Sequence, residues 1–464
     1  MSAIAEILAQ LGYTVRGSDQ KESANVRRLR ARGMKVFIGH DPANIVGRPY
    51  VVMSSAVKPG NVELEAARAK GLTIIRRAEM LAELMRFKRT VSVTGTHGKT
   101  TTTSLIAHLL EQASLDPTVI TGGIIQAWGS NARLGVGDWM VVEADESDGT
   151  FTKLPSEIGI VTNIDPEHLD HFGSVERMHE EFATFLKNIP FYGLAVACID
   201  HPVVRQLLAK LDMRNNGRRL LTYGEAEDAD LKLQSLRFEG RKTLFDVALS
   251  ARVKGGARRL EGWMIPVPGA HNAFNALAAI AAASEAGITD ASIRASLASF
   301  SGVKRRFEPT GSWNGVGIFD DYAHHPAEIG ATLKAARAAT RGRVIAVMQP
   351  HRYTRLRDLF DDFAGSFIDA DAVVVTPMYS AGEAPITGID HTALAARVAA
   401  LGHPQVRAIA SEREIAPLLR DWARPGDSVV CLGAGTITDW ANALQQWLSE
   451  GDRQLAAPLA GSAL

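Results

Sequence analysis

A short apolar strand that runs directly into a loop rich in glycine and threonine is the feature that most constrains this chain. Residues 90–94 are followed by Gly95-Thr96-His97-Gly98-Lys99-Thr100-Thr101-Thr102, and then by a helix with its leucines and isoleucine on one face. Glycines let backbone N–H groups turn toward an anion, and the start of a helix adds partial positive charge. The Lys99 side chain can reach the β- and γ-phosphates of a nucleotide, and the Thr100 or Thr101 hydroxyl can bind Mg²⁺. The segment therefore predicts a nucleotide-binding loop.

This loop is shorter than the common phosphate-loop pattern G-x-x-x-x-G-K-[S/T], because Val93 occupies the place of the first glycine of that pattern. The alternative is a loop that only connects a strand to a helix. A lysine with four threonines in a strand–loop–helix context favours phosphate binding.

Composition restricts the class of protein. At roughly 150 residues per domain, 464 residues suggest about three domains. Lys+Arg and Asp+Glu are both 51, so the chain lacks the broad basic field that non-specific nucleic-acid binding needs. The hydrophobic fraction of 46% indicates a globular protein, and neither a membrane-spanning run nor a secretory signal is visible. Cys198 and Cys431 are too few for a disulfide framework, which favours a reducing cytoplasm. We expect no nucleic-acid or membrane partner, and a monomer or weak homodimer.

Short apolar strands alternate with amphipathic helices, which predicts an α/β fold with parallel sheets. Three blocks are separated, at 1–87, 88–300 and 301–464. The first block predicts helices over 2–11 and 78–85. The predicted strands are 14–17, 34–38, 50–53 and 73–75 in the first block, 90–94, 139–143 and 158–163 in the second, and 316–319, 344–348, 372–376 and 428–432 in the third. The tail 451–464 is expected to be frayed.

Acidic and histidine residues follow two strands of the second block. Strand 139–143 ends in Glu143-Ala144-Asp145-Glu146-Ser147-Asp148, and strand 158–163 is followed by Ile164-Asp165-Pro166-Glu167-His168. Ligands bind beyond the carboxyl ends of parallel strands, so both clusters should lie near Lys99. Glu143 suits Mg²⁺, which prefers oxygen ligands. A solvated acidic loop remains open for the acidic run, and spacing alone favours an ordinary surface histidine at position 168. Zinc is not favoured, because no thiolate or close pair of histidines accompanies His168.

Two polar segments lie near the boundary between the second and third blocks. His271, Asn272 and Asn275 open a helix, where an asparagine either caps the helix or hydrogen-bonds an adenine edge. Lys304-Arg305-Arg306-Phe307-Glu308 is a basic run at a presumed hinge, from which an arginine could move onto a γ-phosphate. A simple basic linker is the alternative for this run.

Polar clusters follow all four predicted strands of the third block. Because parallel strands end at one edge of a sheet, the clusters together predict a site. Arg352 and Arg355 suit a carboxylate held by paired hydrogen bonds. A surface role remains open for each single residue. The clusters are Asp320-Asp321-Tyr322-Ala323-His324-His325, Gln349-Pro350-His351-Arg352-Tyr353-Thr354-Arg355, Met378–Pro385 and Gly433-Ala434-Gly435-Thr436.

With these residues in place, the chain resembles the Mur ligase family over nearly its whole length. The motifs that carry the resemblance, in the family's order, are GTHGKTTTT, EADESDGTF, TNIDPEHLDHF, GAHNAFNALAA, KRRFE, DDYAHHPAEI, QPHRYTR and YSAGEAPITG. The resemblance implies a Rossmann-like UDP-binding domain, a central P-loop ATPase-type domain and a C-terminal Rossmann-like domain. It also implies ATP, Mg²⁺ and a reaction that joins the muramic acid carboxylate of a UDP-linked sugar to L-alanine through an acyl phosphate, in peptidoglycan precursor synthesis.

The resemblance implies roles for individual residues. Lys99 and His168 would be catalytic, and Thr100, Glu143 and His168 would hold the metal. The remaining implied assignments are Gly95, Thr96, His97, Gly98, Lys99, Thr100 and Thr101 for the ATP phosphates; Asn272, Arg306 and Asp321 for the adenine, γ-phosphate and ribose; Tyr322, His324, His351, Arg352 and Arg355 for the alanine pocket and its approach; and Asp19, Ser54 and Ser55 for the UDP domain.

The chain departs from the family at its front. The family normally has a strand and a G-I-G-G turn shortly before M-S-x-I-A-E-I-L, and this chain starts at that methionine. We therefore expect the domain over 1–87 to lack the turn that would cradle the UDP diphosphate. A start-site error or a truncation is the hypothesis that accounts for it.

Several functions compete at this stage. His324 and His351 are both candidates for the base that receives a proton from the alanine amine. Within the family, a ligase for a preformed peptide is the main rival, and EADESDGTF favours alanine over it. A folate polyglutamate ligase fits the UDP-type first block less well. A nicotinamide-dependent oxidoreductase, suggested by Asp19, leaves the Lys99 loop unexplained, and a non-catalytic nucleotide switch predicts ATP binding without turnover.

Overall fold

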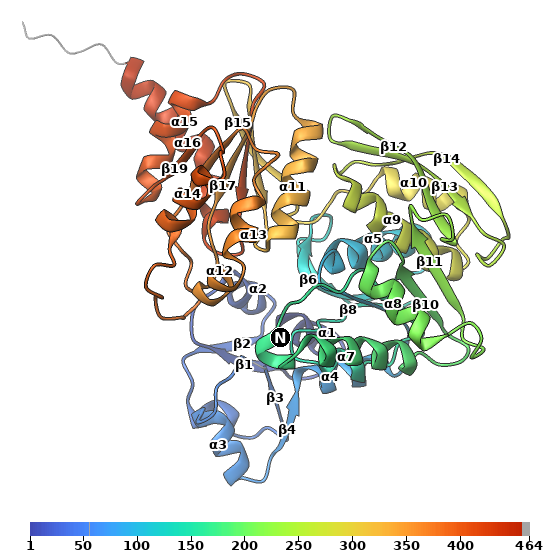
Figure 1. The fold of residues 1–464 in the computed structure, drawn as a ribbon. Helices are drawn as coiled ribbons and strands as arrows, with labels where there is room; N and C mark the ends of the chain where they lie inside the picture. The colour runs from blue at the N-terminus through green and yellow to red at the C-terminus, as the bar shows by residue number, and fades with distance from the viewer. Residues whose placement is uncertain (55, 457–464) are drawn as a thin grey trace, which may run out of the picture. The chain divides into compact units, whose positions relative to one another are not determined.

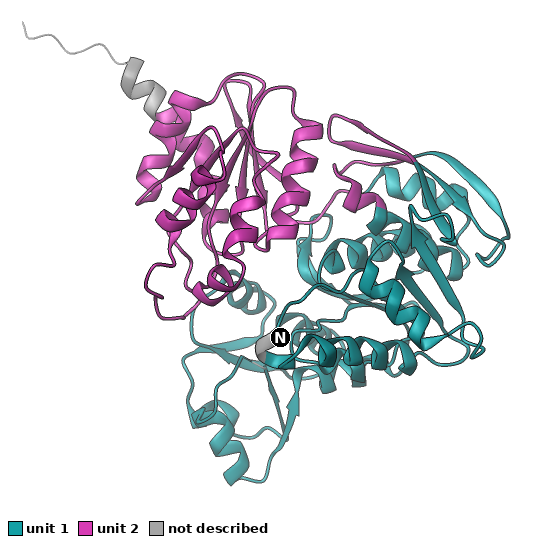
Figure 2. Cartoon of the chain, in the orientation of Figure 1, with its two compact units in different colours: residues 1–234, 246–263, 274–300 teal, residues 235–245, 264–273, 301–464 magenta. Residues whose placement is uncertain are grey.

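The computed structural model describes residues 1–54 and 56–456, which pack as two compact units. Unit 1 comprises residues 1–234, 246–263 and 274–300, and unit 2 comprises 235–245, 264–273 and the chain from 301 onward (Figure 2). The first two predicted blocks thus fall into unit 1, apart from two short segments. The division into three domains at 87 and 300 stays a prediction.

The start of unit 1 holds two small parallel sheets, in which β1 pairs with β2 and β3 pairs with β4. The strand predicted at 14–17 is wrong by two residues. Pairing with Lys35–Ile38 in register places β1 at Arg16–Asp19, so Asp19 does end the strand. The elements of this region are α1 (Ser2–Gln10), β1 (Arg16–Asp19), α2 (Ala24–Ala31), β2 (Lys35–Ile38), η1 (Pro42–Ile45), β3 (Tyr50–Met53), α3 (Val62–Ala69), β4 (Thr73–Arg76) and α4 (Arg77–Met85).

A ten-stranded sheet in the order β14-β13-β12-β11-β10-β9-β5-β8-β6-β7 follows (Figure 1). Strand β5 (Arg89–Thr94) lies between β8 (Trp139–Glu143) and β9 (Ile158–Val161) and is parallel to both. The three carboxyl ends therefore meet at one edge, which is where the sequence placed the site. The other strands are β6 (Thr118–Ile125), β7 (Ser130–Arg133), β10 (Leu194–Cys198), β11 (Leu220–Gly224), β12 (Leu231–Glu239), β13 (Lys242–Leu249) and β14 (Arg258–Ile265).

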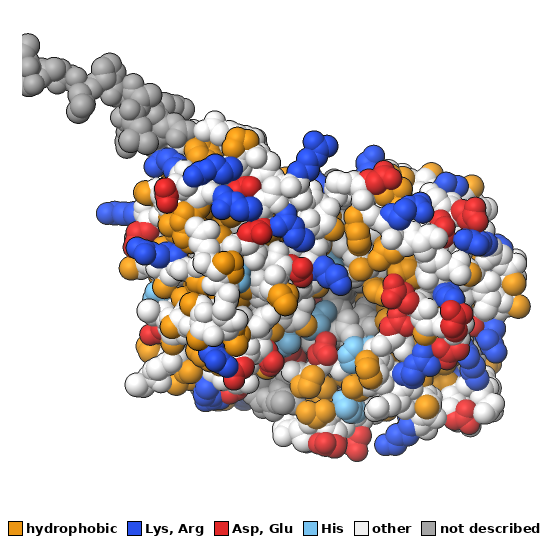
Figure 3. Space-filling model, turned by 45° about the horizontal axis from the view of Figure 1, so that its top comes forward, with side chains coloured by type: hydrophobic (Ala, Val, Ile, Leu, Met, Phe, Trp, Pro, Cys, Tyr) orange, Lys and Arg blue, Asp and Glu red, His pale blue; other side chains and the backbone are white. Residues whose placement is uncertain are grey.

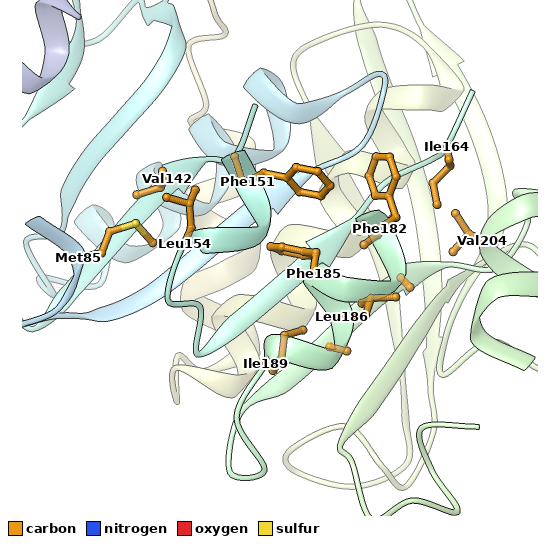
Figure 4. Close-up of a cluster of buried hydrophobic side chains, with 14 of the residues drawn as sticks. Met85, Val142, Phe151, Leu154, Ile164, Phe182, Phe185, Leu186, Ile189 and Val204 are labelled. Carbon is orange, nitrogen blue, oxygen red and sulfur yellow. The ribbon is translucent and has the colours of Figure 1, made fainter. Parts of the chain in front are cut away.

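An aromatic cluster forms part of the core behind this edge. Helix α7 (Val175–Asn188) buries Met178, Phe182, Phe185 and Leu186, a spacing that puts them on one face. Phe151 packs against Phe182 and Phe185 with ring centroids 5.1 and 5.6 Å apart (Figure 4). The remaining helices are α5 (Lys99–Gln112), η2 (Thr150–Lys153), α6 (Leu169–Phe172), α8 (Pro202–Leu211), α9 (Ala270–Glu285), which passes from unit 2 into unit 1, and α10 (Asp290–Ala298).

Unit 2 is built on a six-stranded sheet in the order β15-β16-β20-β17-β18-β19. Only β15 runs antiparallel to its neighbour, so the four predicted strands end at the same edge. The elements are β15 (Glu308–Trp313), β16 (Val316–Asp321), α11 (Pro326–Ala339), β17 (Val344–Met348), α12 (Tyr353–Asp358), α13 (Phe360–Gly365), β18 (Ala372–Val375), α14 (His391–Ala400), β19 (Val406–Ala408), η3 (Glu412–Glu414), α15 (Ile415–Trp422), β20 (Ser428–Leu432) and α16 (Ile437–Ala456).

Strands β17, β18 and β20 are buried at every position, as expected of a parallel sheet that is covered on both faces. Along β17, Val344, Ala346 and Met348 join one core with α11, α13 and α14, while Ile345 and Val347 join another with α15 and α16. The tail predicted to fray from 451 continues as helix α16 to Ala456, and 457–464 lie outside the described residues.

Charged side chains of both signs are interspersed over the face seen in Figure 3, in keeping with the balanced composition. Within residues 1–54 and 56–456, no helix is both long enough and apolar enough to cross a membrane.

Candidate active site

The loop after β5 has a shape that only glycine allows at two positions. Gly95 has φ 128°, and a Cβ there would lie 2.9 Å from the Asn163 carbonyl oxygen and closer still to Thr162 Oγ1. Gly98, with φ 84°, precedes the first residue of α5, and a Cβ there would lie 2.6 Å from Asn275 Oδ1. The two predicted glycines thus bring the loop close to neighbouring backbone and side chains.

The end of β9 holds this loop in place. Asn163 Oδ1 accepts from the His97 N–H at 2.7 Å, and its Nδ2 donates to the His97 carbonyl at 3.0 Å. Thr96 Oγ1 exchanges two hydrogen bonds with the backbone of Asp165, at 2.8 and 3.2 Å. The loop is therefore preorganised by the segment that follows the neighbouring strand.

Lys99, the first residue of α5, points back into the loop. Its Nζ donates to the carbonyls of Gly95 at 2.6 Å and Thr96 at 3.1 Å, and to Glu146 Oε1 at 2.8 Å. Burial lowers the pKa of Lys99, but the charges of Glu146 and Glu143 outweigh it and leave the pKa raised. Burial raises the pKa of Glu146 to about 7 despite the nearby ammonium. Glu146 lies in the predicted acidic cluster but had no predicted role, because only the folded chain brings it to Lys99.

Glu143 and Thr100, predicted as metal ligands, lie together. Thr100 Oγ1 donates to Glu143 Oε1 at 3.1 Å, while Glu143 Oε2 accepts from Thr121 Oγ1 at 2.9 Å and the Gly122 N–H at 2.6 Å. A threonine hydroxyl and a carboxylate beside a phosphate loop are the oxygen donors that Mg²⁺ prefers. Thr101, which follows Thr100 in the chain, is buried in the first turn of α5.

His168 lies in a second group with Glu146 and Glu167. Its Nε2 is 3.8 Å from one oxygen of each carboxylate, and one ligand atom from each of the three lies within 4.8 Å of the others. Its backbone has φ 56°, an unusual value for a non-glycine residue. The structure thus gathers His168 with Glu146 and Glu167, whereas the predicted set joined it to Thr100 and Glu143. Glu167 had no role in the prediction, and its only signal was its place beside His168.

His97 faces an acid rather than open solvent. Asp165 Oδ2 lies 3.4 Å from His97 Nε2, and Asp165 Oδ1 lies 3.2 Å from His201 Nε2. Hydrogen bonds from His201 and His97 hold the pKa of Asp165 well below its usual range. His201 was not predicted, since nothing in its sequence neighbourhood points to the loop.

In unit 2, strand β16 ends at Asp321, which is buried. Asp321 Oδ2 accepts from the Phe307 N–H and Oδ1 from the Ala323 N–H, both at 2.8 Å. Burial raises the pKa of Asp321 to about 6. The Arg306 guanidinium lies 5.6 Å from the ring centre of Tyr322, and its Nη1 is 3.9 Å from Glu328 Oε1.

The predicted pocket residues of unit 2 form an aromatic row. The His324 ring lies 5.1 Å from Tyr322 and 5.7 Å from His351, and His351 stacks on Tyr379 at 5.4 Å. Burial and the charge of His324 lower the pKa of His351 to about 4, so this ring is neutral at pH 7. Tyr379, on the loop after β18, was not assigned in the prediction.

The two pocket arginines have different surroundings. Arg352 Nε donates to Glu383 Oε1 at 2.6 Å, and Thr354 adds two more hydrogen bonds to the same carboxylate. Arg355 Nη1 lies 3.4 Å from His351 Nδ1. Asn272, also in unit 2, is buried and its Nδ2 donates to the Pro268 carbonyl at 2.7 Å.

The predicted residues of the first region lie at strand ends. Asp19 Oδ1 accepts from the Lys21 N–H at 3.2 Å, and Ser54 Oγ accepts from the Ala56 N–H at 3.3 Å. Ser55 lies outside the described residues. A polar network that sequence reasoning missed adjoins β1: Glu63 accepts from Ser18 Oγ at 2.6 Å and from Asn44 Nδ2 at 2.7 Å.

Three family models match the chain. Residues 1–89 match "Mur ligase family, catalytic domain", residues 93–283 match "Mur ligase middle domain", and residues 305–435 match "Mur ligase, glutamate ligase domain".

Curated proteins and solved structures agree with this match. The chain is 57% identical to the UDP-N-acetylmuramate–L-alanine ligase of Brucella anthropi, over 97% of this chain and 95% of that protein. It is 56% identical to the enzyme of the same name from Methylobacterium radiotolerans, over 98% and 96%. The crystal structure of UDP-N-acetylmuramate-alanine ligase from Thermotoga maritima is 26% identical, with a TM-score of 0.81 over 97% of each chain. A murein peptide ligase from Psychrobacter arcticus is 25% identical, with a TM-score of 0.68 over 97% of this chain and 96% of that one.

Proposed function

The chain belongs to the Mur ligase family, and from this membership we infer that it joins UDP-N-acetylmuramate to L-alanine at the cost of ATP. The product is the first amino-acid adduct in peptidoglycan precursor synthesis. The predicted three-domain α/β fold and the predicted ligase activity are thereby confirmed. The observation that carries the site assignment is the loop Gly95–Thr100. In it, Thr100 contacts Glu143, the last residue of β8, and Lys99 contacts Glu146, three residues further on.

The reaction must first make the lactyl carboxylate of the sugar electrophilic. Its negative charge repels an amine, and transfer of the γ-phosphoryl group of ATP converts it to an acyl phosphate with a good leaving group. Lys99 lies where it can stabilise charge on that phosphoryl group, held by the carbonyls of Gly95 and Thr96. The amine then attacks, and the tetrahedral intermediate collapses to amide and phosphate.

The donors around the loop fit Mg²⁺. Glu143 and Thr100 are oxygen ligands already in contact, and His168 stands with two further carboxylates. We assign Thr100, Glu143 and His168 to metal binding, as predicted, and add Glu146 and Glu167 as nearby acids. When bound, Mg²⁺ neutralises charge on the phosphates.

The amino acid is assigned to unit 2. Alanine must lose a proton from its ammonium group before it attacks. His351 is neutral at pH 7, so its ring can receive that proton, and the neighbouring His324 stays the second candidate. We assign Tyr322, His324, His351 and Arg355 to the pocket and its approach, with Arg352 as a residue that shapes it.

The remaining assignments follow the family. Asn272 is assigned to the adenine, Asp321 to the ribose, Arg306 to the γ-phosphate, and Asp19 and Ser54 to the UDP region. We propose the division into domains at 1–87, 88–300 and 301–464, and a monomer or weak homodimer.

The cytoplasm is the proposed compartment. The reaction consumes ATP, and both cysteines are free and buried, which suits reducing conditions.

A phosphate-release assay tests this function. We expect phosphate from ATP only when both UDP-N-acetylmuramate and L-alanine are present. Phosphate released with a tripeptide and not with alanine would instead identify a peptide ligase. ATP binding without turnover would identify a nucleotide switch, and binding of NAD with no ATP turnover an oxidoreductase.

A further inference from the structure

The Lys99 ammonium has no hydrogen-bonding capacity left for a phosphate. An ammonium has three N–H donors, and the acceptors within reach are the Gly95 carbonyl, the Thr96 carbonyl and Glu146 Oε1. A phosphate that binds Lys99 must therefore take the place of one of them. The two carbonyls belong to a loop that the β9 end holds rigidly, so the side chain of Glu146 is the partner that can leave.

Glu146 is held less firmly than its neighbour Glu143. Glu143 accepts hydrogen bonds from two threonine hydroxyls and a backbone N–H. Glu146 is only 2% exposed, yet its Oε2 is buried without a hydrogen-bond partner among the described residues. A buried carboxylate with an unsatisfied oxygen is a costly arrangement. The other carboxylate oxygen, Glu146 Oε1, accepts the hydrogen bond from the Lys99 ammonium at 2.8 Å.

We propose that Glu146 is a positioning residue that occupies the phosphate-binding direction of Lys99 until a nucleotide displaces it. The proposal rests on the proposed function, since it concerns how the loop receives ATP. Glu146 keeps Lys99 directed into the loop and balances its charge in the nucleotide-free protein. The entering phosphate exchanges one anion for another, so part of its binding energy goes into breaking the Lys99–Glu146 pair.

Removing the charge of Glu146 should therefore tighten nucleotide binding, whereas removing the charge of an ordinary structural acid would not. Glu146→Gln keeps the shape of the side chain but removes the competing charge. We expect ATP to bind about tenfold more tightly to this variant. This is the size of effect expected when the phosphate no longer has to break one hydrogen bond between charged groups, here that of Lys99 to Glu146. ADP should also bind more tightly, because Lys99 reaches the β-phosphate, whereas AMP affinity should stay within threefold. A structural role predicts unchanged or weaker binding of all three nucleotides.

Isothermal titration calorimetry of the full chain tests this. ATP, ADP and AMP are titrated in EDTA, which removes any contribution of Mg²⁺, and thermal melting checks that each variant is folded. Glu167→Gln is the matched control, because it removes a charge from the same cluster at the residue that faces His168. Its ATP affinity should change less than threefold. In a Lys99→Met background, Glu146→Gln should give no tightening.

Two failures are distinguishable. If the natural chain binds no ATP even with Mg²⁺, the proposed function itself is wrong, and this proposal with it. If the natural chain binds ATP but Glu146→Gln binds it equally or more weakly, only the role of Glu146 is overturned. Should Glu146→Gln not fold, Glu146→Asp, which withdraws the carboxylate by one methylene, must bind ATP more tightly than the natural chain, or the proposal fails.

Discussion

Replacing Gly95 with alanine probes the shape of the phosphate loop. The new methyl would lie 2.9 Å from the Asn163 carbonyl oxygen and well inside van der Waals distance of Thr162 Oγ1, on a residue with φ 128°. Thr162 Oγ1 is not free to turn away without loss, because it donates to the His97 carbonyl at 2.7 Å. Relief therefore requires the loop itself to move.

The size of the effect follows from that movement. Relieving the contacts needs a shift of about 1 Å, and a misplacement of that size costs about 100-fold in rate. We expect Gly95→Ala to lower kcat/KM for ATP by about 100-fold in a phosphate-release assay. Gly98→Ala is the matched variant: its methyl, at φ 84°, meets only side-chain atoms of Asn275, with Oδ1 at 2.6 Å. Moving that amide costs the 3.1 Å hydrogen bond that Thr102 Oγ1 donates to it but leaves the loop backbone in place. The loss for Gly98→Ala should be closer to tenfold, from about 1–2 kcal/mol of backbone strain.

Thermal melting separates a distorted loop from an unfolded protein. A folded Gly95→Ala variant with kcat/KM within threefold of the natural chain would refute the reasoning, because the loop would then tolerate a side chain that the geometry excludes. Equal losses for Gly95→Ala and Gly98→Ala would refute the distinction between a backbone contact and a side-chain contact.

Two further predictions concern the metal and the pH dependence of stability. Glu143→Gln should raise the Mg²⁺ concentration for half-maximal activity about tenfold or more, since it weakens one oxygen ligand; an unchanged Mg²⁺ titration would remove Glu143 from the metal site. The pKa of His351 in the folded protein is about 4, below its ordinary 6.5. Between pH 4 and 6.5, His351 is therefore protonated in the unfolded chain but not in the folded chain. Stability should therefore fall as pH drops from 6.5 to 4, and His351→Asn should lose part of this dependence in urea unfolding; identical pH profiles would contradict it.

Local patterns made much of the fold predictable. The run VIAVM of β17 is apolar at every position, and the structure buries it on both faces. The phosphate loop was readable because a strand, a glycine-rich turn and a helix are adjacent in sequence. The first strand was misplaced because β1 has little apolar signal, with the sequence RGSD, and pairing with β2 decides where it begins.

Contacts between distant residues could not be read in this way. Glu146 approaches Lys99 from 47 positions away, and His201 approaches Asp165 from 36. Nothing local in sequence distinguishes Glu146, beside the loop, from Asp148, whose carboxylate caps a turn by accepting from Thr150. The order of β5, β8 and β9 in the sheet decides which acid meets the lysine.

The pairing of a cation with an internal glutamate recurs in unit 2, where the same reasoning predicts the opposite result. Glu383 accepts from Arg352 Nε at 2.6 Å, the Thr354 N–H at 3.0 Å and Thr354 Oγ1 at 2.8 Å. Burial raises the pKa of Glu383, but these hydrogen bonds outweigh it and bring the pKa to about 2.

A carboxylate held by three donors belongs to the framework, so it will not leave for a substrate. Glu383→Gln should therefore loosen the turn between Arg352 and Thr354 and raise KM for L-alanine about tenfold, with KM for ATP within threefold. If Glu383→Gln instead lowered KM for alanine, Arg352 would be a cation released for substrate, and the number of donors around an acid would not tell a framework carboxylate from an exchangeable one.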